Sequence, residues 1–270
     1  MWSGQWDVRW FDEIDSTNIY VRDQARQGAA EGLVAVADYQ RAGRGRLDRR
    51  WESPPGANLL ASVLLRPNCA VEHFHLCTGA LALAAREACR EVAGVSAVLK
   101  WPNDLLVGEA KLAGVLAEVD FVAESPFVVA GIGLNLAWPG PAEAGGTCLD
   151  ALVGTDLAGT DLVGTDLAGT DLAGTDLART PLERRHVLAA LLKALASRRP
   201  LLDDAEGRAL LADEVRAHCA TLGRQVRVEL PGGHCLGRAE AIDDDGCLVV
   251  ATATGPVRVA VGDVVHVRAG

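Results

Sequence analysis

The chain has 270 residues, 49% of them hydrophobic, which is enough apolar sequence for one large domain and a second small one. Its formal net charge of −10 makes it a poor general nucleic-acid binder, because such binding depends on neutralising phosphate charge. The seven cysteines lack Cys-x-x-Cys spacing, which predicts reduced thiols, and there is no signal-like leader or apolar run of about 18 residues. We therefore expect a cytoplasmic protein with no membrane partner.

The amino-terminal third is predicted to alternate strands and helices. Its predicted elements are a strand at 6–14, a helix at 19–27, strands at 33–39 and 58–66, and a helix at 71–92. Asp15, Ser16, Thr17 and Asn18 precede the first helix and have the chemistry of a helix N-cap. On this local evidence alone, plain capping is favoured over a ligand role.

A basic, glycine-containing loop follows the second predicted strand. Its four arginines can bind carboxylate or phosphate groups through two parallel hydrogen bonds, and its two glycines let the backbone approach a ligand closely. A solvated basic loop is the alternative, since charged loops are common. In an acidic chain the loop favours a small anionic ligand, and its sequence is Ala42-Gly43-Arg44-Gly45-Arg46-Leu47-Asp48-Arg49-Arg50-Trp51.

Lysine is rare in this chain and is concentrated in two motifs. The 26 basic Lys and Arg residues include only three lysines, Lys100, Lys111 and Lys193. A coding bias toward arginine explains their rarity but not their positions. Lys111 enters an apolar strand, where an unpaired charge is costly. Lys100 opens a motif at the end of a strand predicted at 97–101, where plain turn chemistry is the alternative: Lys100-Trp101-Pro102-Asn103-Asp104.

The middle of the chain completes a predicted sheet. Further strands are predicted at 105–107, 111–119 and 126–134, and a mostly antiparallel sheet with helices on one side is an α+β architecture. The last strand ends in Gly131-Ile132-Gly133-Leu134-Asn135. Neither this motif nor the basic loop has the third glycine of the dinucleotide fingerprint, and no GxxxxGK[ST] sequence is present. A bound nucleotide would therefore need another design of site.

The carboxyl-terminal half begins with a low-complexity insert. Residues 153–177 are five copies of [Val/Ala]-Gly-Thr-Asp-Leu, similar to pentapeptide repeats but too few to stack a core of their own. We expect a tandem expansion within a surface loop that takes no part in the chemistry. Two amphipathic helices are then predicted at 182–197 and 205–221, and a small β-barrel from strands at 225–229, 237–242, 248–252, 257–261 and 264–268.

Taken together, these motifs resemble the biotin–protein ligase family. The stretches at 42–51, 100–105, 111–118 and 131–135 occur in the family's order and spacing, and the match runs from about residue 10 to 268 apart from the insert. The resemblance implies a class II synthetase-like α+β catalytic domain at 1–220 and an SH3-like domain at 221–270.

The resemblance implies a two-step reaction. Biotin and ATP, with Mg²⁺, form biotinyl-5′-adenylate and pyrophosphate, and a lysine of a biotin carboxyl carrier protein then takes the biotinyl group and releases AMP. This chemistry requires positioned reactants and charge stabilisation more than a classical nucleophile.

The resemblance also assigns residues to the two substrates. The implied biotin-binding residues are Ser16, Thr17, Asn18, Gln40, Gly43, Arg44, Gly45, Arg46, Lys111 and Gly114. Those implied for ATP and the adenylate are Arg46, Arg49, Trp51, Lys100, Trp101, Asn103, Lys111 and Asn135. The implied catalytic residues are Lys111, Arg46, Lys100 and Asp104, and Asp104 is also the expected Mg²⁺ ligand.

One position departs from the family pattern. Asp48 stands where the ligand loop usually has a glycine. Asp adopts positive φ more readily than most residues, so we expect the loop to keep its conformation. A negative charge near the phosphates would weaken nucleotide binding.

Three alternatives remain open at this point. Some family members carry an amino-terminal DNA-binding domain, whereas this chain begins at the first catalytic strand, so we expect a monofunctional ligase with no DNA partner. A lipoate or octanoate transferase shares a related fold, but the basic loop and the Lys-Trp-Pro-Asn-Asp motif favour biotin. A non-catalytic biotin-binding protein would not need Lys111 and Arg46. The expected oligomeric state is a monomer or a homodimer.

Overall fold

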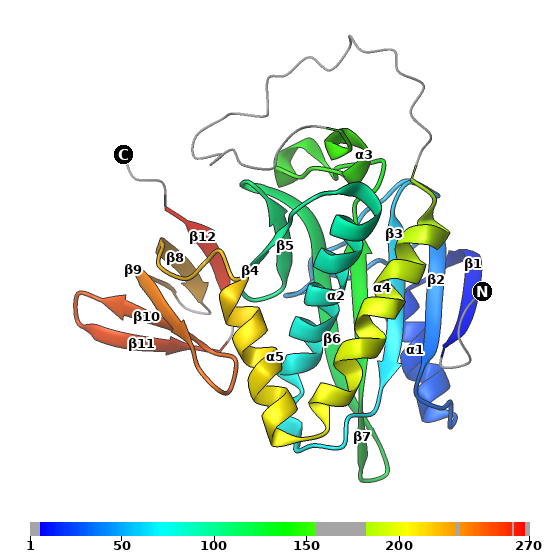
Figure 1. Cartoon of the computed structure of the whole chain (residues 1–270), viewed down its shortest axis with the longest axis horizontal. Coiled ribbons are helices and arrows are strands. Elements are labelled where there is room, and N and C mark those ends of the chain that lie inside the picture. The colour runs from blue at the N-terminus through cyan, green and yellow to red at the C-terminus, as the bar shows by residue number, and fades with distance from the viewer. Residues whose placement is uncertain (1–5, 155–181, 231–232, 261, 268–270) are drawn as a thin grey trace.

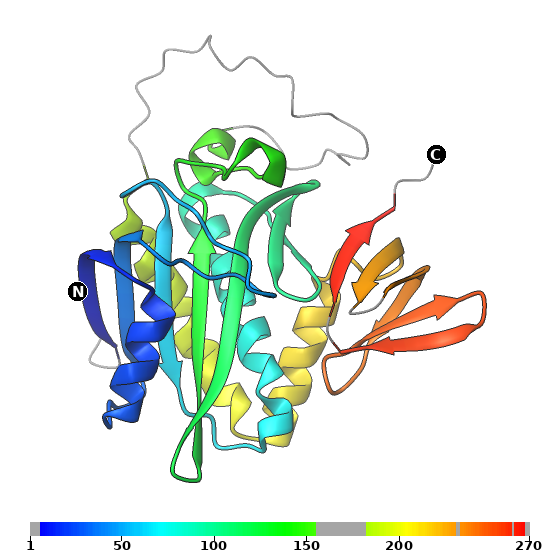
Figure 2. The same ribbon diagram turned by 180° about the vertical axis from the view of Figure 1, so that it is seen from behind.

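The computed structural model describes residues 6–154, 182–230, 233–260 and 262–267. They form a seven-stranded sheet with helices on both faces and a five-stranded sheet beside it (Figures 1 and 2). No helix within these ranges is long and apolar enough to cross a membrane. The repeat insert lies outside the described residues from position 155 onward.

The large sheet has the strand order β1-β2-β3-β7-β6-β5-β4. Strands β1 and β2 are parallel, and every other neighbouring pair is antiparallel, which confirms the mostly antiparallel α+β class. Its strands are β1 (Asp7–Ile14), β2 (Leu33–Gln40), β3 (Leu59–Leu65), β4 (Val98–Lys100), β5 (Asp104–Val107), β6 (Ala110–Val122) and β7 (Ser125–Leu134).

Helices cover both faces of this sheet, so the expectation of helices on one side is wrong. Strand β2 is apolar at successive positions, so each face offers a surface to bury. Leu33 and Ala35 pack in one cluster with α1 (Thr17–Arg26), whereas Val34 and Val36 face the main core on the other side. Helix α1 is the crossover between the parallel pair β1 and β2, and Figure 2 shows it alone on its face.

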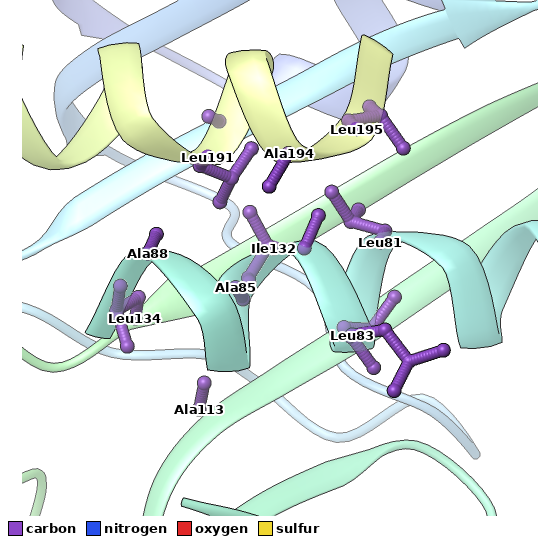
Figure 3. Packing of buried hydrophobic residues seen from close by; sticks show 14 of the residues in the cluster. Leu81, Leu83, Ala85, Ala88, Ala113, Ile132, Leu134, Leu191, Ala194 and Leu195 are labelled. Atoms are coloured by element: carbon purple, nitrogen blue, oxygen red, sulfur yellow. The ribbon is translucent and has the colours of Figure 1, made fainter. Parts of the chain in front are cut away.

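The main core lies between the sheet and two packed helices, α2 (His75–Ala93) and α4 (Arg184–Arg198). Alanine at the contact positions lets the helix backbones approach each other and the sheet. Figure 3 shows the two helices meeting over the strands through Leu81, Ala85, Leu191 and Ala194.

The helices differ from the prediction in some boundaries and in the presence of short additional elements. The helix expected from residue 71 begins as a 3₁₀ turn, η1 (Val71–His73), and α2 follows. The helix expected to reach residue 221 ends earlier, as α5 (Ala205–Ala217). The short helical elements that the sequence did not indicate are η2 (Ala142–Ala144), α3 (Leu149–Leu152) and η4 (Arg199–Leu202).

The second sheet contains all five strands predicted near the carboxyl terminus, in the order β11-β10-β9-β8-β12. They are β8 (Gln225–Leu230), β9 (Gly233–Ile242), β10 (Leu248–Thr252), β11 (Gly255–Val259) and β12 (Asp263–His266). Closure of this sheet into a barrel remains a prediction.

Backbone contacts and one tryptophan join the second sheet to the first. The N–H of Leu99 donates to His218 O at 2.9 Å, and the N–H of Ala220 donates to Leu99 O at 2.7 Å. Trp101, at the end of β4, is buried in the core of the second sheet, where its indole N–H donates to Gly246 O at 3.0 Å. The carboxyl-terminal sheet is thereby held beside the mouth of the site described next.

Candidate active site

A cavity of about 740 Å³ opens between the strand ends of the large sheet, the basic loop and the carboxyl-terminal sheet. Every residue that the family resemblance assigned lines it, with the exception of Gly43. Gly43 shapes the loop instead, because a Cβ there would lie 2.4 Å from the carbonyl oxygen of Trp51. Residues far apart in the sequence are thus brought to one place.

One end of the cavity is a buried polar cluster at the start of α1. The backbone N–H of Thr17 donates to Gln40 Oε1 at 2.7 Å, and the Thr17 hydroxyl lies 3.0 Å from the same oxygen. Ser16 occupies the helix N-cap position, but its hydroxyl lines the cavity and makes no capping hydrogen bond. The favoured interpretation of this segment as plain capping is therefore wrong.

Two residues of this cluster were missed by the sequence analysis. The hydroxyl of Ser62, on β3, lies 2.7 Å from Thr17 Oγ1 and 2.6 Å from Asn18 Oδ1. Glu118, on β6, accepts from Asn18 Nδ2 at 2.8 Å and from Arg44 at 3.0 Å. A serine within the otherwise apolar run of β3 was the one available signal for Ser62.

The other end of the cavity is cationic. Lys111 Nζ lies 2.7 Å from Asp104 Oδ1 and 5.4 Å from the centre of a Trp51 ring. Lys100 also lines the cavity, and its side chain has no hydrogen bond or ion pair with the described residues. A paired lysine and an unpaired one are thus available to phosphate or carboxylate oxygens.

Trp51 is the aromatic wall between the two ends. It packs flat against a glycine surface, since a Cβ at Gly114 or Gly133 would lie 3.0 or 2.3 Å from its ring. These glycines face each other in register on β6 and β7. The glycines are visible in the sequence, but their contact with the indole ring of Trp51 is not.

The basic loop is folded on itself and held by the carboxyl-terminal sheet. Leu47 and Asp48 have φ of 54° and 57°, so the expected positive φ at Asp48 is confirmed. The Asp48 side chain is exposed and does not line the cavity. Arg49 pairs with Asp263 of β12, and Arg46 lies 3.9 Å from the same carboxylate. Burial lowers the pKa of Arg46, and the nearby Asp263 opposes that shift.

Three further predicted residues have clear structural contacts. Asn135 is buried, and its amide N–H groups face the carbonyls of Pro139 and Thr147, each at 3.0 Å, which fixes the loop after β7. Asn103 donates to Val115 O at 2.6 Å and accepts from Arg46 at 3.4 Å. Trp101, as described above, anchors the second sheet.

The loop after β7 and strand β12 also line the cavity, although no motif indicated them. Pro139, Gly140 and Gly146 contribute from the loop, and Asp263 and Val264 from β12. The carbonyl of Gly145 accepts from the Lys111 N–H at 3.1 Å, so this loop pairs with the start of β6. These residues carry no ligand-binding pattern of their own, and only the fold places them at the site.

The donor set suits a magnesium ion held mainly by substrate phosphates. Within the described ranges no three His, Cys, Asp or Glu side chains are grouped as a metal site. Asp104 offers one carboxylate, with one oxygen already on Lys111. Mg²⁺ commonly binds through one or two carboxylates together with phosphate oxygens and water, and Asp104 fits that pattern.

Comparison with known families divides the chain in the same way. Residues 10–135 match the Biotin/lipoate A/B protein ligase family, and residues 221–267 match the Biotin protein ligase C terminal domain. Residues 152–184 match pentapeptide repeats in eight copies, a longer stretch than the five perfect copies.

Individual relatives give the same result over greater lengths. The biotin--[acetyl-CoA-carboxylase] ligase of Mycobacterium tuberculosis is 35% identical over 262 residues, 95% of this chain and 87% of the relative. The bifunctional ligase/repressor BirA of Escherichia coli is 38% identical over 129 residues, 46% of this chain and 39% of that protein. The biotin protein ligase from Aquifex aeolicus, solved in complex with biotin and ATP, has a TM-score of 0.74 at 25% identity and covers 97% of this chain and 99% of its own. The chain belongs to the biotin–protein ligase family.

Proposed function

We propose that the protein is an ATP-dependent biotin–protein ligase. It activates biotin to biotinyl-5′-adenylate and transfers the biotinyl group to a lysine of a biotin carboxyl carrier protein. The observation that carries this proposal is a single cavity with a buried polar cluster at one end and Lys100, Lys111 and Arg46 at the other. Such a cavity suits a ligand with a polar ring, a chain and a terminal carboxylate.

The polar end favours a cyclic urea over a lipoyl or octanoyl group. Ser16, Thr17 and Asn18 are at most 6% exposed, and their polar groups face a confined space. A urea ring carries both N–H donors and a carbonyl acceptor, whereas a dithiolane ring or an alkyl chain would leave buried hydrogen-bonding groups unpaired. A site of this kind rejects a ligand that lacks matching polar groups.

The cationic end suits adenylation. A biotin carboxylate oxygen attacks the α-phosphorus of ATP, the bond to the bridging oxygen of the β-phosphate breaks, and pyrophosphate leaves. Lys111 and Arg46 stabilise the oxygens on which negative charge develops, and Lys100 adds a further cation. Trp51 and the basic loop shield the mixed anhydride from water, which would otherwise hydrolyse it.

Asp104 has two proposed roles at the mouth of the cavity. It is the residue that would hold Mg²⁺, which supplies charge neutralisation on the triphosphate. In the second half-reaction it would orient the incoming lysine amine of the carrier protein. Its ion pair with Lys111 keeps the carboxylate at the reacting end of the cavity.

We also propose the domain division given by the two sheets. Residues 1–220 form the catalytic domain and residues 221–270 the SH3-like domain, and the match of residues 221–267 to a separate carboxyl-terminal family supports the boundary. A net charge of −10 supports the absence of a DNA partner.

The test is pyrophosphate release with Mg-ATP before any carrier protein is added. Biotin, lipoate and octanoate are compared at equal concentration. Release with biotin alone, stopping near one equivalent because the adenylate is retained, would support the proposal. Release only with lipoate or octanoate would assign the chain to the sister activity, and tight biotin binding without release would indicate a binding protein.

A further inference from the structure

A single carboxylate touches both sides of the polar end of the cavity. Glu118 accepts from Asn18 Nδ2 at 2.8 Å through one oxygen and from Arg44 at 3.0 Å through the other. Its side chain is 23% exposed, and it lies on β6 seven residues after Lys111. Arg44 comes from the basic loop and Asn18 from α1, so Glu118 ties a loop and a helix to one strand.

The contact with Asn18 fixes which way that amide faces, together with a longer hydrogen bond from Asn18 Nδ2 to Leu116 O at 3.2 Å. A carboxylate only accepts hydrogen bonds, so the NH₂ group of Asn18 must face Glu118, and its carbonyl oxygen must face Ser62. That carbonyl also only accepts, so the Ser62 hydroxyl donates its one proton to it, at 2.6 Å. Ser62 is fully buried, and no water is needed to complete this chain.

The same reasoning sets the directions of the hydrogen bonds as far as the cavity wall. With its own proton on Asn18, the Ser62 oxygen is free to accept from the Thr17 hydroxyl, 2.7 Å away. Gln40 Oε1 does not require that proton, because the Thr17 backbone N–H already donates to it at 2.7 Å. The Thr17 oxygen is then left with its lone pairs for a ligand N–H.

The other oxygen of Glu118 positions Arg44 as a hydrogen-bond donor to the same ligand. It takes one guanidinium N–H of Arg44, whose side chain lines the cavity, and leaves the other donors of that group for a carbonyl. An acceptor at Thr17 and a donor at Arg44 match the N–H and C=O of a urea ring.

We propose that Glu118 is the positioning residue for the ring of the substrate: it orients the chain Asn18–Ser62–Thr17 toward an acceptor and holds Arg44 as a donor. Glu118 acts through these residues and does not contact the substrate. The inference rests on the proposed function, since it names the part of biotin that the cluster recognises.

The first test is Glu118→Gln, which keeps the shape of the side chain. Its NH₂ group would face a donor of either Asn18 or Arg44, so one of these two contacts, the part-buried one or the exposed one, becomes donor against donor. We expect KM for biotin, and Kd for biotin measured without ATP, to rise about tenfold, the effect of leaving one donor unpaired. KM for ATP and kcat should stay within about twofold.

Two further variants separate this role from a general structural one. Glu91→Gln removes a matched carboxylate, paired with Lys193 on the helical face, and should leave KM for biotin unchanged. Ser62→Ala interrupts the same series of hydrogen bonds, one residue further from Glu118 than Asn18. The double variant Glu118→Gln/Ser62→Ala should therefore lose clearly less than the product of the two single effects.

The outcomes distinguish this inference from the proposed function. If the wild-type protein releases pyrophosphate with biotin but Glu118→Gln binds biotin normally, the positioning role is wrong and the ligase assignment stands. Equal rises in KM for ATP and biotin, or strictly multiplicative effects in the double variant, would also overturn it. If the wild-type protein neither binds biotin nor releases pyrophosphate with it, the proposed function itself fails.

Discussion

Lys111 links three groups of the cavity at the scale of single residues. Its ammonium lies 2.7 Å from Asp104 and 5.4 Å from the centre of a Trp51 ring, and its backbone N–H holds the loop after β7. A flexible cation held by a carboxylate in the resting site can move onto substrate oxygens as their charge develops. Lys111 therefore has a structural role, and the chemical role is the one we propose for it.

We predict that Lys111→Ala slows biotin adenylation by at least about a hundredfold, the usual effect of removing one preorganised charge-stabilising group. The rate of pyrophosphate release at saturating biotin and ATP measures this effect. Lys193→Ala is the matched control, because that lysine pairs with Glu91 far from the cavity. Activity of Lys111→Ala within a few-fold of the parent would refute the role.

At the scale of elements, strands β6 and β7 shape the wall of the cavity beside Trp51 through paired glycines. Gly114 and Gly133 are opposite each other, and both contact the Trp51 ring. The loop and the sheet are therefore complementary in shape only if both positions lack a Cβ.

The corresponding prediction concerns Gly133→Ala. A Cβ there would lie 2.3 Å from Trp51, so the ring would have to move away from β7. We expect KM for ATP to rise about tenfold, because an active-site group displaced by about 1 Å commonly costs more than the loss of one weak contact. Ser125→Ala, at the opposite end of β7, serves as the control. An unchanged KM for ATP would show that Trp51 does not contact the nucleotide.

Strand β12 connects the two sheets through a buried histidine. His266 lies 3.2 Å from both Thr221 Oγ1 and Arg224, and 3.6 Å from Glu109 on the turn between β5 and β6. Burial, together with Arg224 and Lys100, lowers the pKa of His266, whereas Glu109 acts in the opposite direction. His266 is therefore neutral in the folded protein at a pH where an exposed histidine is protonated.

This shift predicts a pH dependence of stability. In the unfolded chain His266 has its ordinary pKa of about 6.5, so its contribution is fully present above that pH and is lost as the pH falls through it. We expect the thermal midpoint to decrease between about pH 7.5 and pH 5.5, and His266→Gln to flatten part of that slope. Burial also lowers the pKa of His75 and His218, so the thermal midpoint of His266→Gln should still decrease as the pH falls.

His234→Gln is the matched control for this experiment, since His234 is exposed on β9. It should leave the slope of the thermal midpoint against pH unchanged. A slope that is equally steep in His266→Gln and in the parent would show that His266 does not contribute to it.

At the scale of the whole molecule, the repeat insert is bounded by two described segments that lie close together. The Leu182 N–H donates to Asp150 Oδ1 at 3.3 Å, so the chain leaves and re-enters the fold at one place. A loop that starts and ends at neighbouring points can be shortened without moving the elements it joins.

We predict that replacing residues 155–181 with a Gly/Ser linker of about six residues leaves KM, kcat and the thermal midpoint close to the parental values. The two proteins are compared in the pyrophosphate assay and by thermal unfolding. A large loss of activity with an unchanged thermal midpoint would assign the repeats a part in the reaction.

The strands and the class of fold could be predicted from the pattern of the sequence, and the family resemblance identified most residues of the cavity. Motifs such as 42–51 and 100–104 can be found without a structure, because unusual residue types at strand ends stand out against an apolar chain. The positive φ at Asp48 was expected because the resemblance places a glycine there, and Asp tolerates such a φ better than most residues.

The face that each helix covers and the distant residues that complete the site became clear from the three-dimensional structure alone. A strand that is apolar on both sides does not say where its helices lie, so the expectation of helices on one side did not foresee that α1 covers the face opposite α2 and α4. Ser62 and Asp263 carry no motif, Glu118 ends the 111–118 motif without having been expected at the site, and Asp263 meets Arg49 across 214 positions of sequence. Such contacts depend on packing and sheet order, which no local pattern in the chain encodes.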